Sequence, residues 1–182
     1  LEAQTIKTQP ADVVFCLADN PASVTFTVGA TPVTSYQWQY LNGKVWENFI
    51  DVTGVIKGSK TATLTLYRPT IGWRTTNSGL VRVKVTYLLN TIYSRQAALE
   101  INSPATITTN PVNATIWIGE TNTFSGSASG KPAPAYQWQR YIKSVWADIT
   151  GATSSTYTTG SSGSYRLKVT NTCGTDYSSA AV

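Results

Sequence analysis

A four-residue motif that occurs twice constrains the fold of this chain more than any other feature of the sequence. Tyr-Gln-Trp-Gln at residues 36–39 returns unchanged at residues 136–139. The match continues beyond the motif, because Trp46 recurs as Trp146 in the same relation to it. Further matched segments are residues 6–10 with 107–111 and residues 78–86 with 162–170. The sequence is therefore one structural unit written twice, with extra length in the first copy before its Ser-Gly turn.

The repeat divides the 182 residues into two domains. We expect domain 1 at residues 1–102 and domain 2 at residues 103–182, each long enough to bury its own core. Residues 102–104, Asn-Ser-Pro, would form a linker too short to be floppy, since proline restricts the backbone. The strand that begins at Tyr177 is shorter than its counterpart in domain 1. We therefore expect either a piece of a longer parent or an incomplete sheet edge.

Alternation of apolar and polar residues predicts β-strands in both copies. In the repeated motif, Tyr36, Trp38 and Tyr40 fall on one face of a strand, and Gln37 and Gln39 fall on the other. No segment has a helical period. The other predicted strands are residues 13–15, 24–28, 45–46, 61–66, 81–85, 97–101, 115–118, 121–127, 136–141, 144–146, 156–158, 164–170 and 177–182. Many short strands with frequent turns indicate an all-β fold of two tandem antiparallel β-sandwich domains.

Composition limits the classes of partner. Charged residues are 13% of the chain, about half the average for globular proteins, whereas Thr, Ser, Val and aromatic residues are frequent. This composition is typical of β-rich extracellular proteins. The net charge of +5 comes from Lys and Arg scattered singly, so we expect no nucleic-acid partner. No stretch approaches the ~20 consecutive apolar residues of a membrane helix, and we expect no transmembrane segment.

Enzyme activity is not expected. The chain has no His, the commonest general base and metal ligand near neutral pH. Its nine Asp and Glu residues are dispersed, although distant strands could in principle bring two carboxylates together. No phosphate-binding glycine loop, zinc spacing or calcium loop occurs. We therefore predict no catalytic residue, no metal site and no cofactor.

The two cysteines lie one in each copy and at non-equivalent positions. Cys16 aligns with Trp117, whereas Cys173 follows the strand that ends near Thr170. A disulfide would have to join distant ends of two elongated domains, and Cα atoms more than ~7 Å apart cannot be bridged. We therefore expect two unpaired thiols, with a disulfide as the alternative.

Several segments resemble a known family. They are the Tyr-Gln-Trp-Gln strand with a Trp eight residues later, Asp-Ile-Thr-Gly-Ala-Thr-Ser-Ser-Thr-Tyr at residues 148–157, and Gly-Ser-Tyr-Arg-Leu-Lys-Val-Thr-Asn at residues 163–171. With Cys-Gly-Thr at residues 173–175, these segments resemble the immunoglobulin-like domains repeated in large secreted and surface proteins, including adhesins, of Bacteroidota. The resemblance covers nearly the whole chain. Domain 1 departs from it at residues 80–81, where Leu-Val replaces the usual Gly-Tyr.

The resemblance implies which residues form the core. The strand with Trp38 or Trp138 would pack between the sheets, and Val83 or Leu167 stands where the wider immunoglobulin superfamily has its second cysteine, so the core would be apolar instead of bridged. Tyr165 stands at the position of the tyrosine corner. The predicted core residues are Trp38, Trp138, Tyr36, Tyr136, Val83, Leu167 and Tyr165.

Four tryptophans are candidates for a role beyond the core. Trp73 and Trp117 have no counterpart in the other copy, so the repeated framework does not explain them. If exposed, they could contact a sugar or a protein; otherwise they cover the side of a domain. Trp46 and Trp146 recur, which favours a packing role, although stacked tryptophans also bind sugars.

A second set of candidate ligand contacts lies on the outward face of the predicted sheet. It comprises Gln37, Gln39, Arg82 and Lys84, and it recurs as Gln137, Gln139, Arg166 and Lys168. Such a donor-rich face could meet an acidic polysaccharide or a protein partner. The alternative is that these residues are the polar, solvent-facing side of an antiparallel sheet.

These observations favour a non-catalytic extracellular structural or adhesion module. By resemblance, it would be a stalk or spacer segment of a larger bacterial surface protein, with neighbouring domains of that chain as its partners. One alternative is a carbohydrate-binding module that recognises a cell-surface glycan. Another is a subunit of a surface filament that self-assembles by strand addition.

Overall fold

The computed structural model describes residues 3–19, 21–67 and 78–182. The chain forms two compact units, Leu1–Ile101 and Asn102–Val182. Apart from the three-residue 3-10 helix Leu17–Asp19, the regular structure of the described residues consists of β-strands. Among these residues, no helix is long and apolar enough to cross a membrane.

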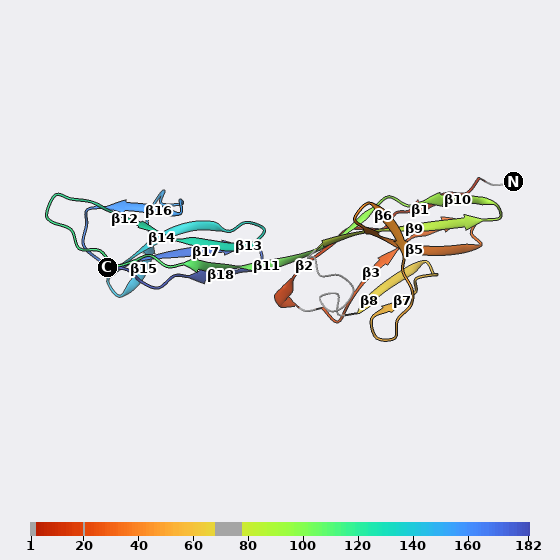
Figure 1. Cartoon of the computed structure of the whole chain (residues 1–182), viewed down its shortest axis with the longest axis horizontal. Helices are drawn as coiled ribbons and strands as arrows, with labels where there is room; N and C mark the ends of the chain where they lie inside the picture. The colour runs from red at the N-terminus through yellow and green to blue at the C-terminus, as the bar shows by residue number, and fades with distance from the viewer. Residues whose placement is uncertain (1–2, 20, 68–77) are drawn as a thin grey trace. The chain divides into compact units, whose positions relative to one another are not determined.

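Unit 1 contains two layers of antiparallel strands (Figure 1). The strands of the first layer are β5 (Ser35–Asn42), β6 (Val45–Asn48), β9 (Ser78–Tyr87), β10 (Asn90–Tyr93) and β11 (Ala97–Thr109). In this layer β6 pairs with β5, β5 with β9, and β9 with both β10 and β11. The second layer has the order β3-β8-β7, formed by β3 (Ser23–Thr27), β7 (Ile56–Lys57) and β8 (Thr63–Tyr67). In addition, β1 (Thr5–Thr8) pairs with β4 (Gly29–Thr31), and β2 (Val13–Cys16) pairs with β11.

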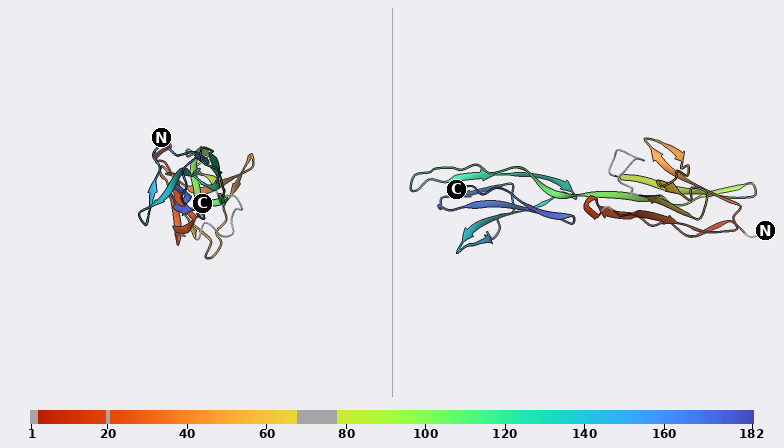
Figure 2. Two further views of the ribbon diagram at one scale, coloured as in Figure 1. Left: turned by 90° about the vertical axis from the view of Figure 1, so that its left-hand side faces the viewer. Right: turned by 90° about the horizontal axis from the view of Figure 1, so that it is seen from below.

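Unit 2 repeats this plan with fewer strands (Figures 1 and 2). Its strands after β11 are β12 (Asn122–Ser125), β13 (Ser127–Lys131), β14 (Ala135–Ile142), β15 (Val145–Asp148), β16 (Thr156–Thr159), β17 (Tyr165–Asn171) and β18 (Gly174–Tyr177). One sheet has the order β15-β14-β17-β18, and β12 pairs with β16 opposite it. The strand β13 pairs with β11. The repeated Tyr-Gln-Trp-Gln motif lies on β5 in unit 1 and on β14 in unit 2.

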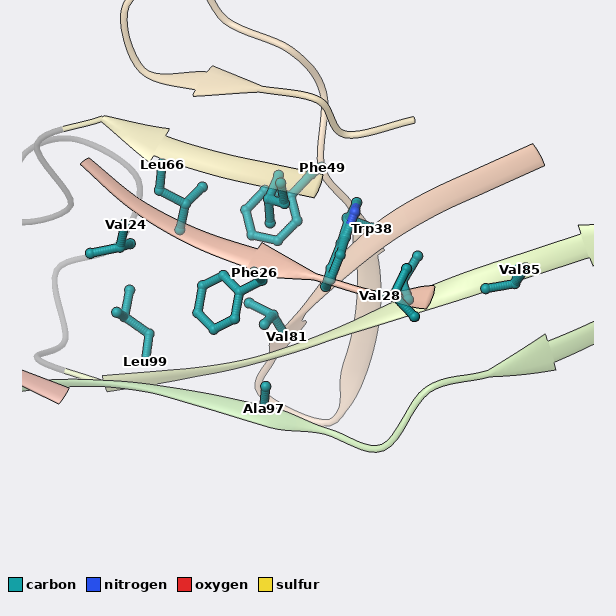
Figure 3. Close-up of a cluster of buried hydrophobic side chains, with 12 residues drawn as sticks. Val24, Phe26, Val28, Trp38, Phe49, Leu66, Val81, Val85, Ala97 and Leu99 are labelled. Carbon is teal, nitrogen blue, oxygen red and sulfur yellow. The ribbon is translucent and has the colours of Figure 1, made fainter. Parts of the chain in front are cut away.

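The core of unit 1 is built around Trp38, whose side chain is fully buried. Trp38 lies opposite Val83 in the register of β5 and β9. Phe26, from the facing sheet, has its ring centroid 6.3 Å from that of Trp38. Figure 3 shows Trp38 and Phe26 among the aliphatic side chains of both layers. The indole Nε1 donates a hydrogen bond to the carbonyl oxygen of Thr61 at 2.9 Å, so the buried N–H is satisfied.

The core of unit 2 follows the same design around Trp138, which is fully buried and pairs in register with Leu167. Its Nε1 donates to the carbonyl oxygen of Ser154 at 3.0 Å. Tyr165 is 1% exposed, and its hydroxyl donates to the carbonyl oxygen of Ser161 at 2.8 Å. This bond to the backbone a few residues upstream is the geometry of a tyrosine corner.

Of the predicted core residues, Tyr36 and Tyr136 are half-buried and pack against the core from its edge. The Tyr136 hydroxyl accepts a hydrogen bond from the backbone N–H of Ala128 at 3.0 Å. A tyrosine at a core edge can keep its hydroxyl hydrogen-bonded while its ring is packed, which explains why these side chains stop short of full burial.

The structure departs from two sequence-based expectations. Residues 102–104, expected to be a linker, continue the strand β11 without interruption, because strand pairing begins again at Ser103 with β13. Residues 115–118, expected to be a strand on their β-branched residues, lie outside all strands. Strand propensity is expressed only where a partner strand supplies hydrogen bonds, and within the part of the chain that the structure describes no strand pairs with this segment.

Replacing Leu167 by Ala should destabilise unit 2 by about 2–5 kcal/mol, because Leu167 is fully buried and the substitution leaves a cavity beneath Trp138. The matched control is Val145→Ala on β15, where the side chain is 60% exposed; it should change the free energy of unfolding by no more than about 0.5 kcal/mol. Urea unfolding followed by tryptophan fluorescence measures both. Equal effects of the two substitutions would contradict this description of the core.

Candidate functional site

The outer face of the first sheet of unit 1 carries an arginine stacked between two aromatic rings. Arg82 on β9 lies opposite Gln39 on β5. Its guanidinium carbon is 4.2 Å from the ring centroid of Trp46 and 4.3 Å from that of Tyr93. Its Nε donates to Gln39 Oε1 at 2.9 Å. Cation–π attraction on both faces and a hydrogen bond at its edge hold the guanidinium in place.

Unit 2 reproduces this stack. The guanidinium carbon of Arg166 is 4.5 Å from the ring centroid of Trp146 and 4.2 Å from that of Tyr177. Its Nε donates to Gln139 Oε1 at 2.7 Å, and Gln139 Nε2 donates to Asp148 Oδ1 at 2.6 Å. Although Gln139 was expected to face solvent, it is only 6% exposed, because the stacked side chains cover this face of the sheet. We call these two constellations the arginine stacks.

The remaining glutamines of the motif also bond within the protein. Gln37 Nε2 donates to the carbonyl oxygens of Trp38 and Phe49, both at 2.9 Å. Gln137 Nε2 donates in the same way to the carbonyl oxygens of Trp138 and Ile149, at 2.9 and 2.8 Å. These bonds link β5 to the residue that follows β6 in unit 1, and β14 to the residue that follows β15 in unit 2. The side chains therefore serve the framework in both units.

Lys84, the remaining predicted contact on this face, lies on β9 opposite Gln37 and is half-buried. Trp73 lies outside the described residues. Trp117 is 82% exposed and belongs to the turn before β12, where its backbone N–H donates to Glu120 Oε2 at 3.0 Å. Gln37, Gln39, Arg82 and Lys84 thus share one face of the first sheet of unit 1, and Trp117 lies in unit 2.

Trp117 borders a pocket of about 410 Å³ in unit 2. The pocket lies between residues 114–119 and residues 159–163, and Asn122, Phe124, Tyr165 and Val182 complete its lining. Its walls combine apolar side chains with the hydroxyl groups of Thr and Ser residues.

Sequence reasoning missed four residues of the framework, namely Tyr93, Tyr177, Ser94 and Ser178. The Ser94 Oγ accepts from the backbone N–H of Val83 at 3.0 Å, and the Ser178 Oγ accepts from that of Leu167 at 2.8 Å. Both serines are 7% exposed. The dipeptide Tyr-Ser in both copies was the available signal.

A carboxylate secures the loop beside the unit 1 motif. Asp51 Oδ1 accepts a hydrogen bond from the backbone N–H of Ser59 at 2.7 Å. Hydrogen bonds from the Ser59 side chain and backbone lower the pKa of Asp51 below its ordinary value. Ser59 in turn accepts from the Trp38 backbone N–H through its carbonyl oxygen, at 2.8 Å. The charged form of Asp51 thus supports the position of the motif strand.

The expectation of two unpaired thiols is wrong. Cys16 and Cys173 are both disulfide-bonded, and the chain has no free cysteine. The expectation assumed that the two residues lie at distant ends of their domains. Cys16 is the last residue of β2, and Cys173 lies in the turn between β17 and β18. Within the residues that the structure describes, no group of three or more metal-ligating side chains occurs.

Comparison with known proteins gives the fold more clearly than the function. No family model matches the sequence. Endoglucanase C of Cellulomonas fimi is 31% identical over 110 residues, which are 58% of this chain and 9% of that protein. The chain therefore spans a small part of this relative.

Solved structures with this fold match nearly the whole chain. The match with an I-band fragment of titin covers 100% of this chain and 65% of the titin fragment, with a TM-score of 0.66 and 16% identity. The match with immunoglobulin domains 1–5 of Sidekick-1 covers 99% of this chain and 38% of the Sidekick-1 structure, with a TM-score of 0.63 and 18% identity. The match with extracellular domains 3–5 of Drosophila OTK covers 99% of this chain and 61% of the OTK structure, with a TM-score of 0.59 and 17% identity. The protein is a tandem of two immunoglobulin-like β-sandwiches.

Arg166→Lys should destabilise unit 2 by about 1–3 kcal/mol although it keeps the charge, because an ammonium group cannot stack on two rings and bond to Gln139 at once. Lys168→Ala on the same strand is the control and should cost no more than about 0.5 kcal/mol. Chemical unfolding of both variants tests the role of the stack. A cost for Arg166→Lys as small as that of the control would show that the stack is not structural.

Proposed function

We propose that this chain is a non-catalytic structural or adhesive module of an extracellular bacterial protein, in which it serves as a stalk or spacer segment. The proposal rests mainly on the observation that the recurring polar side chains contact other parts of the sandwich. Arg82 and Arg166 stack between aromatic rings, and the glutamines of the motif bond to the backbone or to these arginines. The side chains that most resemble a binding face therefore build the sandwich in both units.

Dispersed carboxylates support the non-catalytic part of the proposal. Several of them accept structural hydrogen bonds: Glu47 from Tyr40, Asp12 from Ala98, Asp148 from Gln139 and Asp176 from Ile107. The chain also has no His. The relative named as an endoglucanase is matched over 9% of its length, so its activity is not carried over to this chain.

Two observations support the extracellular part. Both cysteines are disulfide-bonded, and disulfides persist mainly in oxidising compartments. The sequence also resembles immunoglobulin-like domains of Bacteroidota surface proteins. We place the module boundary at residue 102, and neighbouring domains of a larger chain, a cell-surface glycan or a surface protein are the partners that this role implies.

A stalk module should unfold in separate steps under force. With the cysteines reduced so that the disulfide does not restrict extension, single molecules pulled by their ends should give one unfolding step for each unit, because each has its own core. Leu167→Ala should lower the force of one step only. A featureless extension, or release of reducing sugars from soluble cellulose by the intact protein, would overturn the proposal.

Carbohydrate binding is a second candidate, favoured by one residue. Trp117 is 82% exposed beside a pocket lined by hydroxyl groups, and a flat exposed indole is suited to stacking on a sugar ring. In that case Trp117→Ala should abolish the signal on a glycan array while the stability of unit 2 changes by less than about 0.5 kcal/mol. Ile142→Ala, exposed on β14, is the control and should bind normally. An empty array for the unsubstituted protein would exclude this candidate.

A further inference from the structure

The strands β9 and β17 carry a repeated basic sequence that the framework explains only in part. Arg-Val-Lys-Val-Thr at residues 82–86 corresponds to Arg-Leu-Lys-Val-Thr at residues 166–170. The arginines form the arginine stacks. The side chains of Lys84 and Lys168, however, have no hydrogen bond or ion pair with any other described residue. The contacts that hold the sheets together therefore do not involve the two lysine ammonium groups.

The position of these lysines argues against a role in protecting sheet edges. Lysine often lies on edge strands, where its charge discourages pairing with another chain. The strand β9 instead lies between β5 and the strands β10 and β11, and β17 lies between β14 and β18. Both lysines are thus on interior strands, and their recurrence calls for another explanation.

The arginine stack of unit 1 leaves part of the guanidinium accessible. Among the described residues, Gln39 Oε1 is the one hydrogen-bond partner of the Arg82 side chain, and it accepts from Nε. The terminal nitrogens Nη1 and Nη2 have no partner there and are not buried. The rings of Trp46 and Tyr93 stack on the guanidinium and hold it in place. Its terminal N–H groups can therefore donate to a ligand.

Lys84 places a second positive charge beside this guanidinium. Arg82 and Lys84 are two residues apart on β9, so their side chains lie on the same face of the sheet. The residues directly opposite Lys84 are Gln37 on β5 and Tyr93 on β10, and neither is an acid. Two cations without an ion-pair partner among the described residues are therefore neighbours on the outer face of unit 1.

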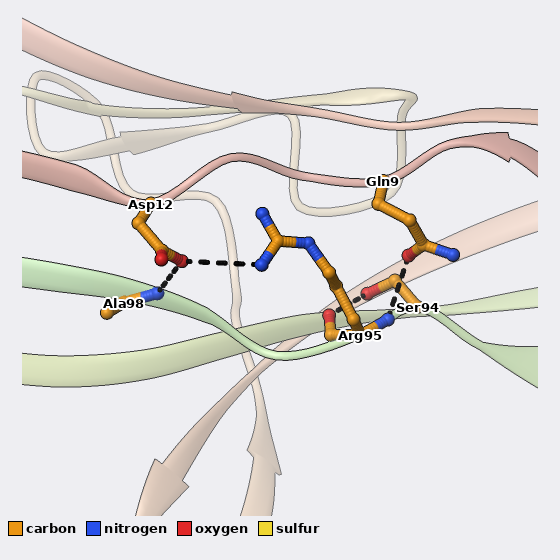
Figure 4. A network of polar contacts seen from close by, with 5 residues as sticks. All are labelled: Gln9, Asp12, Ser94, Arg95 and Ala98. Carbon is orange, nitrogen blue, oxygen red and sulfur yellow. Dashed lines mark hydrogen bonds and ion pairs between the residues drawn. The ribbon is translucent and has the colours of Figure 1, made fainter.

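Another arginine of unit 1 shows the contrast. Arg95 follows β10, and its Nη1 lies 3.9 Å from Asp12 Oδ1 (Figure 4). The Arg95 backbone N–H also donates to Gln9 Oε1 at 2.8 Å. The charge of Arg95 is thus compensated within the fold, which makes this residue a suitable control for effects of net charge alone.

The two units differ in the charge beside the stack. In unit 2, Gln139 Nε2 donates to the carboxylate of Asp148, whereas in unit 1 Gln39 Nε2 donates to the amide oxygen of Asn48 at 2.9 Å. The carboxylate offsets part of the positive charge on the outer face of unit 2, and the amide has no such effect. The outer face of unit 1 is therefore the better site for an anion.

An exposed ring and two hydroxyl groups adjoin the cations of unit 1. Tyr93 is 47% exposed although its ring stacks on Arg82. Thr86 and Thr91 lie on the same face, with their Oγ1 atoms 3.5 Å apart. Aromatic rings can pack on the C–H face of a sugar, and a guanidinium binds a carboxylate through two parallel hydrogen bonds. A uronic acid residue presents both groups, whereas a neutral sugar lacks the carboxylate and an acidic peptide lacks the sugar ring.

We propose that Arg82, Lys84 and Tyr93 on the outer face of unit 1 bind a polysaccharide that carries carboxylate groups. The Arg82 Nη groups donate to one carboxylate, Lys84 supplies the second positive charge, and the sugar ring packs on Tyr93. Trp46 and Gln39 are positioning residues, because they hold the guanidinium. The inference rests on the adhesive form of the proposed function and names the class of its ligand.

The test is a titration of the protein at low ionic strength with a tetramer of galacturonic acid, followed by calorimetry and amide NMR shifts. Saturable binding with shifts at residues 82–84 and 91–93 is expected. The methyl ester of the tetramer has the same rings without the charges, and tetraglutamate has the charges without the rings. Each should bind at least about tenfold more weakly than the acid tetramer.

Three substitutions make the test specific. Lys84→Gln should weaken binding at least about threefold. Arg95→Gln removes the same charge from a side chain that is 51% exposed and should change binding less than about twofold. Asn48→Asp gives unit 1 the carboxylate of unit 2 and should weaken binding at least about twofold. Circular dichroism and urea unfolding show whether the variants are folded.

The proposal fails if the methyl ester or tetraglutamate binds as tightly as the acid tetramer, if Lys84→Gln and Arg95→Gln have equal effects, or if no tetramer binds. Trp117→Ala should leave binding unchanged, and loss of binding in that variant would assign the sugar to unit 2 instead. The unfolding steps measured under force do not depend on any of these results. Failure of this inference can therefore be told apart from failure of the structural role.

Discussion

Burial of one tryptophan between two sheets is the interaction on which each unit depends. Trp38 and Trp138 are fully buried, and both satisfy their indole N–H through a backbone carbonyl of the facing segment. An indole in this position fixes the spacing of the sheets through its volume and their lateral register through its hydrogen bond. Val83 and Leu167 lie beside it in register and add apolar packing to that hydrogen bond.

The same strands carry the arginine stacks on their outer face, and these stacks are the second interaction that holds the strands in order. The arginine stacks join β6, β9 and β10 in unit 1, and β15, β17 and β18 in unit 2. A guanidinium covered on both faces loses much of its hydration, which the rings and a glutamine oxygen replace. This arrangement explains why a donor-rich face recurs in both units as part of the framework.

The sequence predicts the sandwich because its evidence is periodic and repeated: alternation places Trp38 inside, and the second copy confirms it. Alternation also assigns Gln39 and Arg82 to the outer face, but not their partners, since Trp46 and Tyr93 come from strands whose register cannot be read from spacing. The cysteine expectation failed because it relied on an assumed separation of Cys16 and Cys173. The prediction of a strand at residues 115–118 was wrong because β-propensity is a local property, whereas a strand needs a neighbouring strand to pair with. The pocket beside Trp117 could not be predicted, since its walls, residues 114–119 and 159–163, are far apart in the sequence and meet only in the folded unit.

The continuous strand β11 has a consequence for how such a tandem can evolve. An ordinary linker tolerates insertions and deletions, but residues 102–104 are part of a strand. From Ser103 on, this strand pairs with β13, with a register shift between Ser103 and Thr106, and Ala105 inside that irregular stretch is 4% exposed and packs in the core of unit 2. Exchange of one module for another at this joint must therefore keep the pairing of β11 with β13, so the pair is inherited more readily as one cassette than as two separate modules.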